Sequence, residues 1–393
     1  MKQCAIWTLI TLFFFLENIC NFSFPVVGQE IKTHLALSFQ EYAIIGSAFI
    51  LAYSLMMIPA GIVLDLFSLR IVLPCALLIF AMGCFIFSIG TDFHLLVIAR
   101  LTMGIGAAFS LLSSLKYARE NFQDQMALFS AVALSMGMLG GMFAKTPTYF
   151  LLKIVGQMSG VFIAYAVIAI VLAIVMFIFM EHESADKVQF KPKEALNILT
   201  HKNFWRIALY GSLMYSPFLV MEIAWSENYL GLLLPKLSDL MINAIESLVF
   251  LGMIVGSMLL GYMSDHSRNR QDGLFYSAIA VSVVLVGLFY IIPPGQTIIC
   301  ILLFLFGFFT GGFMPSFAYL LQRYPMALSG TVLGMMNCIN MLGATITTPV
   351  MGGALDALRA NTEMDLLLCY QLVFIILPIF TLVAATLIRQ VKD

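Results

Sequence analysis

The chain has 393 residues, of which 61% are hydrophobic and only 10% are charged. Soluble domains carry roughly 25% charged residues, so this composition excludes a soluble enzyme, a secreted disulfide scaffold and a disordered protein. Long unbroken apolar runs such as 161–180 also argue against an outer-membrane barrel, whose strands alternate apolar and polar residues, and they predict an all-α membrane protein.

Twelve apolar runs are each long enough to cross a bilayer, which takes about 20 residues. In chain order they cover 6–27, 41–63, 71–90, 94–114, 126–150, 159–180, 204–225, 240–262, 274–292, 298–320, 329–350 and 367–388. The first run follows Lys2 and resembles a secretory signal, but no small-x-small cleavage site follows it. We therefore interpret it as an uncleaved span and expect twelve transmembrane helices.

The basic residues are distributed unevenly between the two sides of these spans. With a cytoplasmic N-terminus, fourteen of the 20 Lys and Arg residues lie inside, four lie outside and two lie within spans. The positive-inside rule therefore places both termini in the cytoplasm. The longest inside loop, 181–203, separates an N-terminal six-helix bundle at 1–180 from a C-terminal one at 204–393.

The two halves of the sequence match each other at an offset of about 200 residues. The matched pairs are Leu37 and Leu237, Ser38 and Ser238, Ser47 and Ser247, Gly61 and Gly261, Asp65 and Asp265, Arg70 and Arg270, Gly141 and Gly343, and Pro147 and Pro349. An offset that stays between 200 and 202 residues over several spans indicates an internal duplication. Two parallel six-helix repeats are typical of transporters that rock about a site near the membrane midplane.

Segment 61–70, Gly-Ile-Val-Leu-Asp-Leu-Phe-Ser-Leu-Arg, resembles the signature between helices two and three of the major facilitator superfamily. It keeps the Gly, the Asp and one Arg, but has Leu66 for the first basic residue and Ser68 for the second Gly. Segment 261–270 is a similar copy, 100–108 resembles the family's R-x-x-x-G-x-x-A-A pattern, and 137–141 resembles part of the antiporter glycine motif. The resemblance implies two pseudo-symmetric six-helix bundles, and it extends loosely to the branch that includes lysosomal dipeptide carriers.

The same resemblance implies a gate. Asp65 would contact the start of a helix in the opposite half and hold the cytoplasmic side shut, while Arg70 ties the loop to neighbouring carboxylates. Asp265 and Arg270 hold the matching positions in the second half. A carboxylate at a helix N-terminus gains about 0.3–1 kcal/mol. The alternative is that all four are ordinary end-capping and positive-inside residues.

Three charges lie inside spans of the N-terminal half. Glu17 has apolar flanks, so it should be paired, protonated or facing a water-filled cavity, which suits a proton carrier; the alternative is a polar seam with Asn18 and Asn21. Arg100 and Lys145 form an anion-seeking pair, since a guanidinium grips a carboxylate with two hydrogen bonds. Alternatively, Arg100 binds main-chain carbonyls and Lys145 snorkels to the outer interface.

Two carboxylates mark the C-terminal half. Glu246 lies several residues into the eighth span and is expected to face a cavity, where it would bind a proton or a substrate ammonium. Glu222 has the same candidate role, but it is close to Trp225 and the outer end of its span, so a solvated side chain is the alternative. Asn337 and Asn340 in the eleventh span are expected to hydrogen-bond between helices.

Other chemistry is not indicated by the sequence. No metal-ligand spacing, P-loop, GxGxxG or nucleophile–base motif supports an enzyme, a metal site or a cofactor. The seven cysteines form no CxxC pair and are interpreted as small core residues. A net charge of −1 without a polybasic tail gives no indication of nucleic-acid binding.

The expected function is secondary active transport of a small polar solute by alternating access. We expect a monomer in the inner membrane of a bacterium, working as a symporter coupled to protons through Glu17 or Glu246. Because Arg100 and Lys145 accompany these carboxylates, amino acids and short peptides are the first candidates and organic anions the second. The alternatives are proton-driven efflux of lipophilic compounds and a non-transporting membrane sensor or scaffold.

Overall fold

A computed structural model describes residues 2–122, 126–180, 197–267, 269–290, 295–324 and 329–391. Within these ranges the chain is helical apart from short connections and contains no strand. In this described part of the chain, eleven helical stretches are long and apolar enough to cross a membrane. The all-α membrane fold expected from the sequence is therefore confirmed, while residues 181–196 of the expected inter-bundle loop lie outside the described part.

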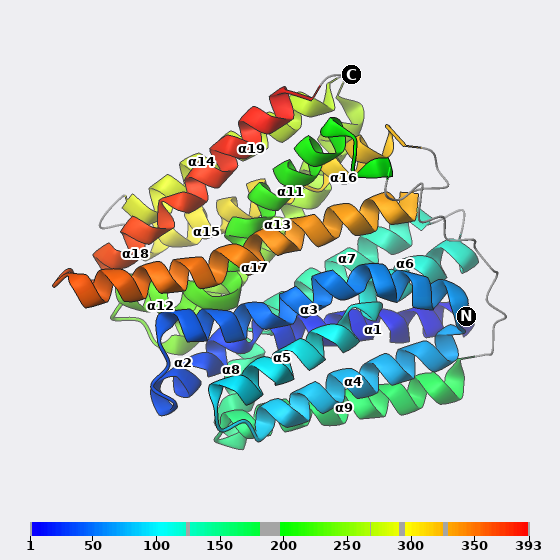
Figure 1. Cartoon of the computed structure of the whole chain (residues 1–393), viewed down its shortest axis with the longest axis horizontal. Helices are drawn as coiled ribbons and strands as arrows, with labels where there is room; N and C mark the ends of the chain where they lie inside the picture. Colours follow the sequence, from blue (N-terminus) through cyan, green and yellow to red (C-terminus); the bar gives the residue numbers. More distant parts are fainter. Residues whose placement is uncertain are drawn as a thin grey trace. The chain divides into compact units, whose positions relative to one another are not determined.

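The helices divide into two compact units by their contacts. The first contains Met1–Leu37 and Ile44–Phe190, and the second contains Ser38–Ala43 and Lys191–Asp393. Figure 1 shows the helices of both in sequence colours, from blue through green to red. Helix α3 (Phe39–Leu66) is shared, since its first turn belongs to the second unit and the rest to the first.

The first unit is built from nine helices in the described residues. They are α1 (Lys2–Phe22), α2 (Phe24–His34), α3, α4 (Leu69–Ser88), α5 (Phe93–Ala107), α6 (Phe109–Asn121), α7 (Met126–Phe143), α8 (Thr146–Val155) and α9 (Met158–Phe179). Three of the expected spans therefore consist of two helices each. Pro25 lies just inside the start of α2, where a missing N–H costs nothing.

The second unit follows the same plan in its described residues. Its helices are α11 (Lys202–Val220), α12 (Ser226–Leu233), α13 (Asp239–His266), α14 (Arg270–Tyr290), α15 (Gln296–Gly311), α16 (Pro315–Leu321), α17 (Ser329–Asn361), α18 (Leu366–Phe374) and α19 (Ile376–Arg389). A π-helical segment, η2 (Met221–Trp225), joins α11 to α12. Pro217 precedes it inside α11, and a proline frees a carbonyl that a wider turn accommodates.

The fifth expected span, 126–150, is not one continuous helix, so that prediction needs correction. Helix α7 ends at Phe143 and α8 begins at Thr146, and only a shorter apolar helix, Val132–Phe143, represents this span. Pro147 explains the break, because it has no N–H to donate and its ring would clash with the carbonyl of Phe143 in a continuous helix. Lys145 lies in the break with φ −88° and ψ −96°, outside helical geometry.

The internal duplication is also visible in the helix bounds and the packing. Helices α3 and α13 both have 28 residues and begin and end 200 positions apart. In the first unit a Cβ on Gly104 of α5 would lie 2.2 Å from the Phe49 oxygen of α3, and in the second a Cβ on Gly307 of α15 would lie 1.9 Å from the Val249 oxygen of α13. Glycine therefore allows the same close helix approach in both repeats.

Replacing Gly307 by alanine is expected to lower the apparent melting temperature of the purified protein, because α13 and α15 must separate to admit the methyl group. Gly273→Ala in α14 is the matched control, since a Cβ there meets nothing within 4 Å and alanine is the better helix former. Differential scanning fluorimetry compares the two. Equal melting temperatures for both variants would show that the close approach is not needed.

Candidate functional site

Glu17 lies on α1 and is buried, with 3% of its surface exposed. Its Oε1 accepts a hydrogen bond from Asn18 Nδ2 at 3.0 Å and another from the Ser110 hydroxyl of α6 at 3.4 Å. Asn18 Nδ2 also donates to the Phe14 carbonyl at 2.8 Å, which fixes the amide. The carboxyl group is thus held between two helices by neutral polar groups.

Arg100 on α5 is fully buried and binds the chain itself. Its Nη2 donates to Asn21 Oδ1 at 3.0 Å and to the Gly46 carbonyl at 3.1 Å. The guanidinium also lies over the rings of Phe24 and Phe49, 5.2 and 4.9 Å from their centres. The contacts join α1, α2, α3 and α5, and they are those that a structural arginine makes with main-chain carbonyls.

Lys145 is fully buried at the break between α7 and α8. A lysine that snorkels leaves its ammonium in water, so the structure contradicts that alternative. Three residues later, Thr148 Oγ1 hydrogen-bonds the Tyr165 hydroxyl at 2.7 Å and ties α8 to α9. The helix break therefore places an ammonium group inside the protein.

Glu222 and Glu246 are both buried, with 1% and 0% of their surfaces exposed. Glu222 belongs to the π-helical segment and Glu246 to α13. The alternative that the Glu222 side chain is solvated is therefore wrong. Trp225 in the same π-helical segment is fully buried, with its ring 6.0 Å from that of Tyr370. The whole segment, including Glu222, is buried with it.

Acidic and aromatic groups gather around the first turn of α3 within the second unit. The Tyr42 ring lies 6.2 Å from that of Trp225, and its hydroxyl is within electrostatic range of Glu227, Tyr370 and Glu246. This cluster was not expected from the sequence, because Tyr42 is about 180 residues or more distant from its neighbours.

The expected gate is only partly described by the structure. The side chains of Asp65 and Asp265 lie outside the described atoms. Arg70 Nε donates to the Phe177 carbonyl at 3.2 Å and lies over its ring at 5.2 Å. This contact fits the end of α9, which presents unpaired carbonyls that attract a cation, while the expected pairing of Arg70 with carboxylates stays a prediction. Lys116, which the motif did not indicate, donates to the Leu64 carbonyl at 2.5 Å.

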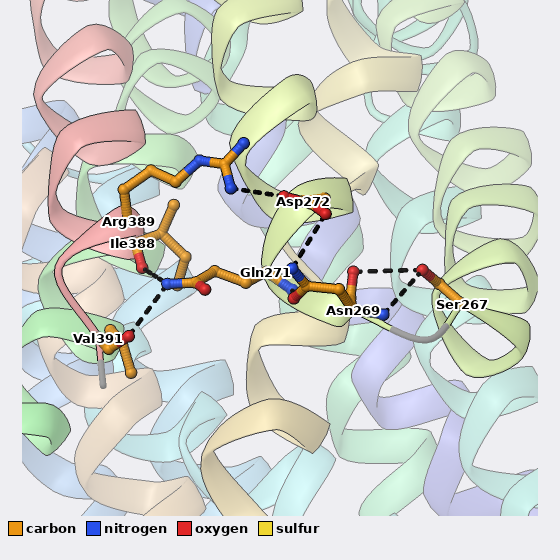
Figure 2. Close-up of polar contacts among 7 residues, drawn as sticks. All are labelled: Ser267, Asn269, Gln271, Asp272, Ile388, Arg389 and Val391. Atoms are coloured by element: carbon orange, nitrogen blue, oxygen red, sulfur yellow. Dashed lines mark hydrogen bonds and ion pairs between the residues drawn. The ribbon is translucent and has the colours of Figure 1, made fainter. Parts of the chain in front are cut away.

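The matching loop of the second unit is joined to the end of α19 (Figure 2). Arg389 Nη1 forms an ion pair with Asp272 Oδ1 at 2.5 Å, and Asn269 Nδ2 donates to Asp272 Oδ2 at 2.9 Å. Gln271 Nε2 donates to two main-chain oxygens near the end of α19. In the first unit Arg70 of α4 binds α9, and in the second unit the equivalent helices α14 and α19 are joined. Here, however, the arginine lies on α19 and not on α14. Comparing the two halves of the sequence position by position therefore does not identify Arg389.

Asn340 on α17 does not make the expected interhelical hydrogen bond. It is fully buried, and neither its amide nitrogen nor its oxygen has a partner in the described part of the chain. A Cβ on Gly211 of α11 would lie 2.5 Å from its Oδ1, and one on Gly343 would meet the Ser212 and Ser216 hydroxyls at 2.3 and 2.4 Å. Glycines thus bring polar groups together between α11 and α17.

Replacing Asn340 by leucine is expected to raise the apparent melting temperature, because an unsatisfied buried amide costs about 1–3 kcal/mol and leucine has a similar volume. If the Asn340 amide hydrogen-bonds a bound solute, the rate of solute transport should fall in the same variant. Thr348→Val is the control, since that hydroxyl already bonds the Ala344 carbonyl at 2.8 Å. A lower melting temperature for Asn340→Leu would contradict the expectation.

The described residues contain no group of three His, Cys, Asp or Glu side chains that could hold a metal ion. The buried charges instead lie among the helices of two repeated units, and this arrangement is typical of membrane transporters. The family model of the Major Facilitator Superfamily matches residues 6–236 and 214–392. The chain therefore belongs to the major facilitator superfamily.

Individual relatives agree with this assignment. The chain is 22% identical over 416 residues to a hexuronate transporter of Escherichia coli, covering 98% of this chain and 92% of the relative. It is 27% identical over 216 residues to the nitrate/nitrite transporter NrtP of Nostoc punctiforme, covering 50% of this chain but only 41% of that relative.

Solved structures share the fold. A bacterial homolog of the human lysosomal transporter Spinster, in its inward-facing unoccupied conformation, matches with a TM-score of 0.76 at 15% identity, over 98% of this chain and 96% of that one. The nucleoside transporter NupG matches with a TM-score of 0.75 at 15% identity, over 98% of both chains. The protein is thus a multi-pass membrane protein of a superfamily of secondary transporters for small solutes, and the relatives are transporters rather than enzymes.

Proposed function

We propose that the protein is a proton-coupled secondary transporter of a small polar solute that carries a carboxylate. Amino acids, short peptides and organic anions such as sugar acids are the candidate substrates. The observation that carries this proposal is the pair of buried opposite charges in the first unit, Glu17 and Lys145. Buried ionisable groups in spans are costly and mark ion or substrate paths.

Glu17 is the proposed proton carrier because its partners suit both protonation states. The Asn18 amide donates to Oε1 when the carboxylate is charged. The Ser110 hydroxyl can donate to a carboxylate and accept from a carboxylic acid. A proton can therefore be gained and lost without leaving the group unsatisfied, which a transport cycle requires.

Lys145 is the proposed site for the carboxylate of the solute. Arg100 holds main-chain oxygens and Asn21 in a structural network, and Lys145 is the other fully buried cation among the described residues of the unit. Two relatives are named for anions, hexuronate and nitrate or nitrite, which supports an acidic solute. Glu222 and Glu246 are the proposed acceptors for a substrate ammonium or a second proton.

The remaining parts of the proposal follow from the sequence. The protein would lie in a bacterial inner membrane with both termini in the cytoplasm and work as a monomer. Asp65 and Asp265 would close the cytoplasmic side in alternation with an outer closure. Arg70 and Arg270 would hold the two loops in place, as the contact of Arg70 with Phe177 does in the first unit.

A ligand screen by thermal shift tests the substrate class, because a ligand that binds the folded state raises its apparent stability. Carboxylate compounds are expected to stabilise the wild type and to lose this effect in Lys145→Gln. Lys153→Gln is the control, since Lys153 lies over the Tyr149 ring at 4.7 Å and not in the break. Stabilisation by cationic dyes alone would contradict the proposal and favour efflux of lipophilic compounds.

A further inference from the structure

Three sulfur atoms from three helices meet in the interior of the first unit. Cys20 Sγ of α1 lies 3.8 Å from Cys84 Sγ of α4 and 3.8 Å from Met103 Sδ of α5. All three side chains are fully buried, and all three residues belong to the first unit. The second and third sulfurs are 64 and 83 residues from the first in the sequence, so no spacing of residues indicated this sulfur triad.

Gly83 explains how α5 comes so close to the helix that carries Cys84. A Cβ on Gly83 would lie 2.6 Å from the Met103 nitrogen, 2.7 Å from the Met103 Cγ and 2.9 Å from the Ala99 oxygen. Any larger residue at 83 would therefore push α5 away from α4. The close approach brings the thioether of Met103 to the helix that supplies one of the two thiols.

Buried aromatic pairs flank the two thiols on both sides. The Phe13 ring of α1 lies 6.1 Å from the Phe80 ring of α4, and the Phe24 ring of α2 lies 6.5 Å from the Phe87 ring of α4. On α4 these phenylalanines are four residues before and three residues after Cys84, so the three side chains share one face of the helix. All four rings are fully buried. The thiols therefore lie in an apolar shell, and such a shell controls the access of solvent to a bound ion.

The matching positions of the second unit carry no sulfur. By the helix bounds and the paired glycines of the two repeats, they are Val220 on α11, one residue of the Val-Leu-Val run 284–286 on α14, and Phe306 on α15. Val220 and Phe306 are buried, so hydrocarbon side chains can fill this part of the core. Sulfur at all three positions is therefore a property of the first unit and is not required by the packing of the repeat.

The ligand set and its spacing favour one kind of metal ion. Thiolate and thioether sulfurs are soft ligands, and the ions that they select include Cu(I). Because a metal–thiolate bond is about 2.3 Å long, two sulfurs that bind one ion at about 110–120° lie about 3.8–4.0 Å apart. Both measured sulfur–sulfur distances are 3.8 Å. Structural zinc takes four ligands and iron–sulfur clusters take four cysteines, whereas Cu(I) is satisfied by three sulfurs.

We propose that Cys20, Cys84 and Met103 form a binding site for one Cu(I) ion. Both thiols lose their protons when they bind the metal, so two protons are released to solvent, and the ion with two thiolates and a neutral thioether carries one negative charge. Arg100 lies one turn before Met103 on α5, and its guanidinium interacts electrostatically with Cys84, which offsets that charge. The bound ion ties α1, α4 and α5 together. The site does not depend on the proposed transport function.

Anaerobic titration of the purified, reduced full-length protein with Cu(I), in competition with the colorimetric chelator bicinchoninate, tests the site. The first variant to be measured keeps only the two cysteines of the sulfur triad and has alanine at the other five, which are Cys4, Cys75, Cys300, Cys338 and Cys369. It should bind one Cu(I) per chain, and a further Cys20→Ala substitution should abolish the binding. Absence of bound Cu(I) in the first variant, or equal binding after Cys20→Ala, would overturn the proposal.

Met103→Leu tests the thioether with a side chain of similar volume. This variant should bind Cu(I) about tenfold more weakly or worse, because leucine offers no ligand. Met214→Leu is the matched control, since Met214 of α11 is equally buried but lies in the second unit. One equivalent of Cu(I) should raise the apparent melting temperature of the control and of the wild type more than that of Met103→Leu. Equal Cu(I) affinity in the two variants, both eluting like the wild type on size exclusion, would contradict a site of three sulfurs.

Discussion

Replacing Glu17 by glutamine is expected to abolish solute accumulation driven by a pH gradient. Glutamine has the same shape and keeps an oxygen that accepts from Asn18 and Ser110, but it cannot carry a proton. Uptake driven by the gradient should therefore fall by roughly tenfold or more, whereas exchange of labelled for unlabelled solute should persist. Proteoliposomes loaded at one pH and diluted into another measure both quantities.

Glu120→Gln is the matched control for this variant. Glu120 lies on α6 like Ser110, and its carboxylate pairs with Lys116 at 3.8 Å with 44% of the side chain exposed. An exposed pair contributes little, so this variant should keep its response to the gradient. If Glu17→Gln responds to the gradient as the wild type does, Glu17 does not carry the coupled proton.

Among the variants considered, the replacement of Arg100 by alanine is expected to lower the stability of the folded protein most. The change leaves Asn21 Oδ1 and the Gly46 carbonyl without their donor, and each unsatisfied buried group costs about 1–3 kcal/mol. It also removes the cation from the rings of Phe24 and Phe49. Little folded protein should be recovered, as measured by size-exclusion chromatography with a fluorescent fusion.

Arg100→Lys separates the structural role from a substrate role. Lysine keeps the charge but not the planar fork that reaches several acceptors, so the melting temperature should fall while the KM for solute stays near that of the wild type. A normal melting temperature with a much higher KM would mean that Arg100 grips the solute, as the sequence suggested, and that its main-chain contacts are secondary.

The fold was largely predictable because its main signals are simple. Lipid requires apolar runs of a minimum length, and the duplication repeats glycines and charged residues at an offset of 200 to 202 residues. The break at Lys145 was not predicted, since hydropathy does not register a single missing hydrogen bond before Pro147. The π-helical segment was missed for the same reason, and with it the burial of Glu222.

The buried charges were predictable, but their partners were not. The cost of a charge in a span singled out Glu17, Arg100, Lys145 and Glu246, and all four are buried. Their partners depend on contacts between distant segments: Arg100 binds the carbonyl of Gly46, 54 residues away.

The central claim is proton-coupled transport of an acidic solute. Net uptake of solute into proteoliposomes under an imposed pH gradient, with no solute loaded inside, tests it most directly. Purified protein is reconstituted, a pH gradient is imposed, and a labelled sugar acid, amino acid or dipeptide is offered from outside. The account predicts accumulation above the outside concentration that collapses when a protonophore is added. Equal inside and outside concentrations with and without the gradient, for every solute that stabilises the protein, would contradict it.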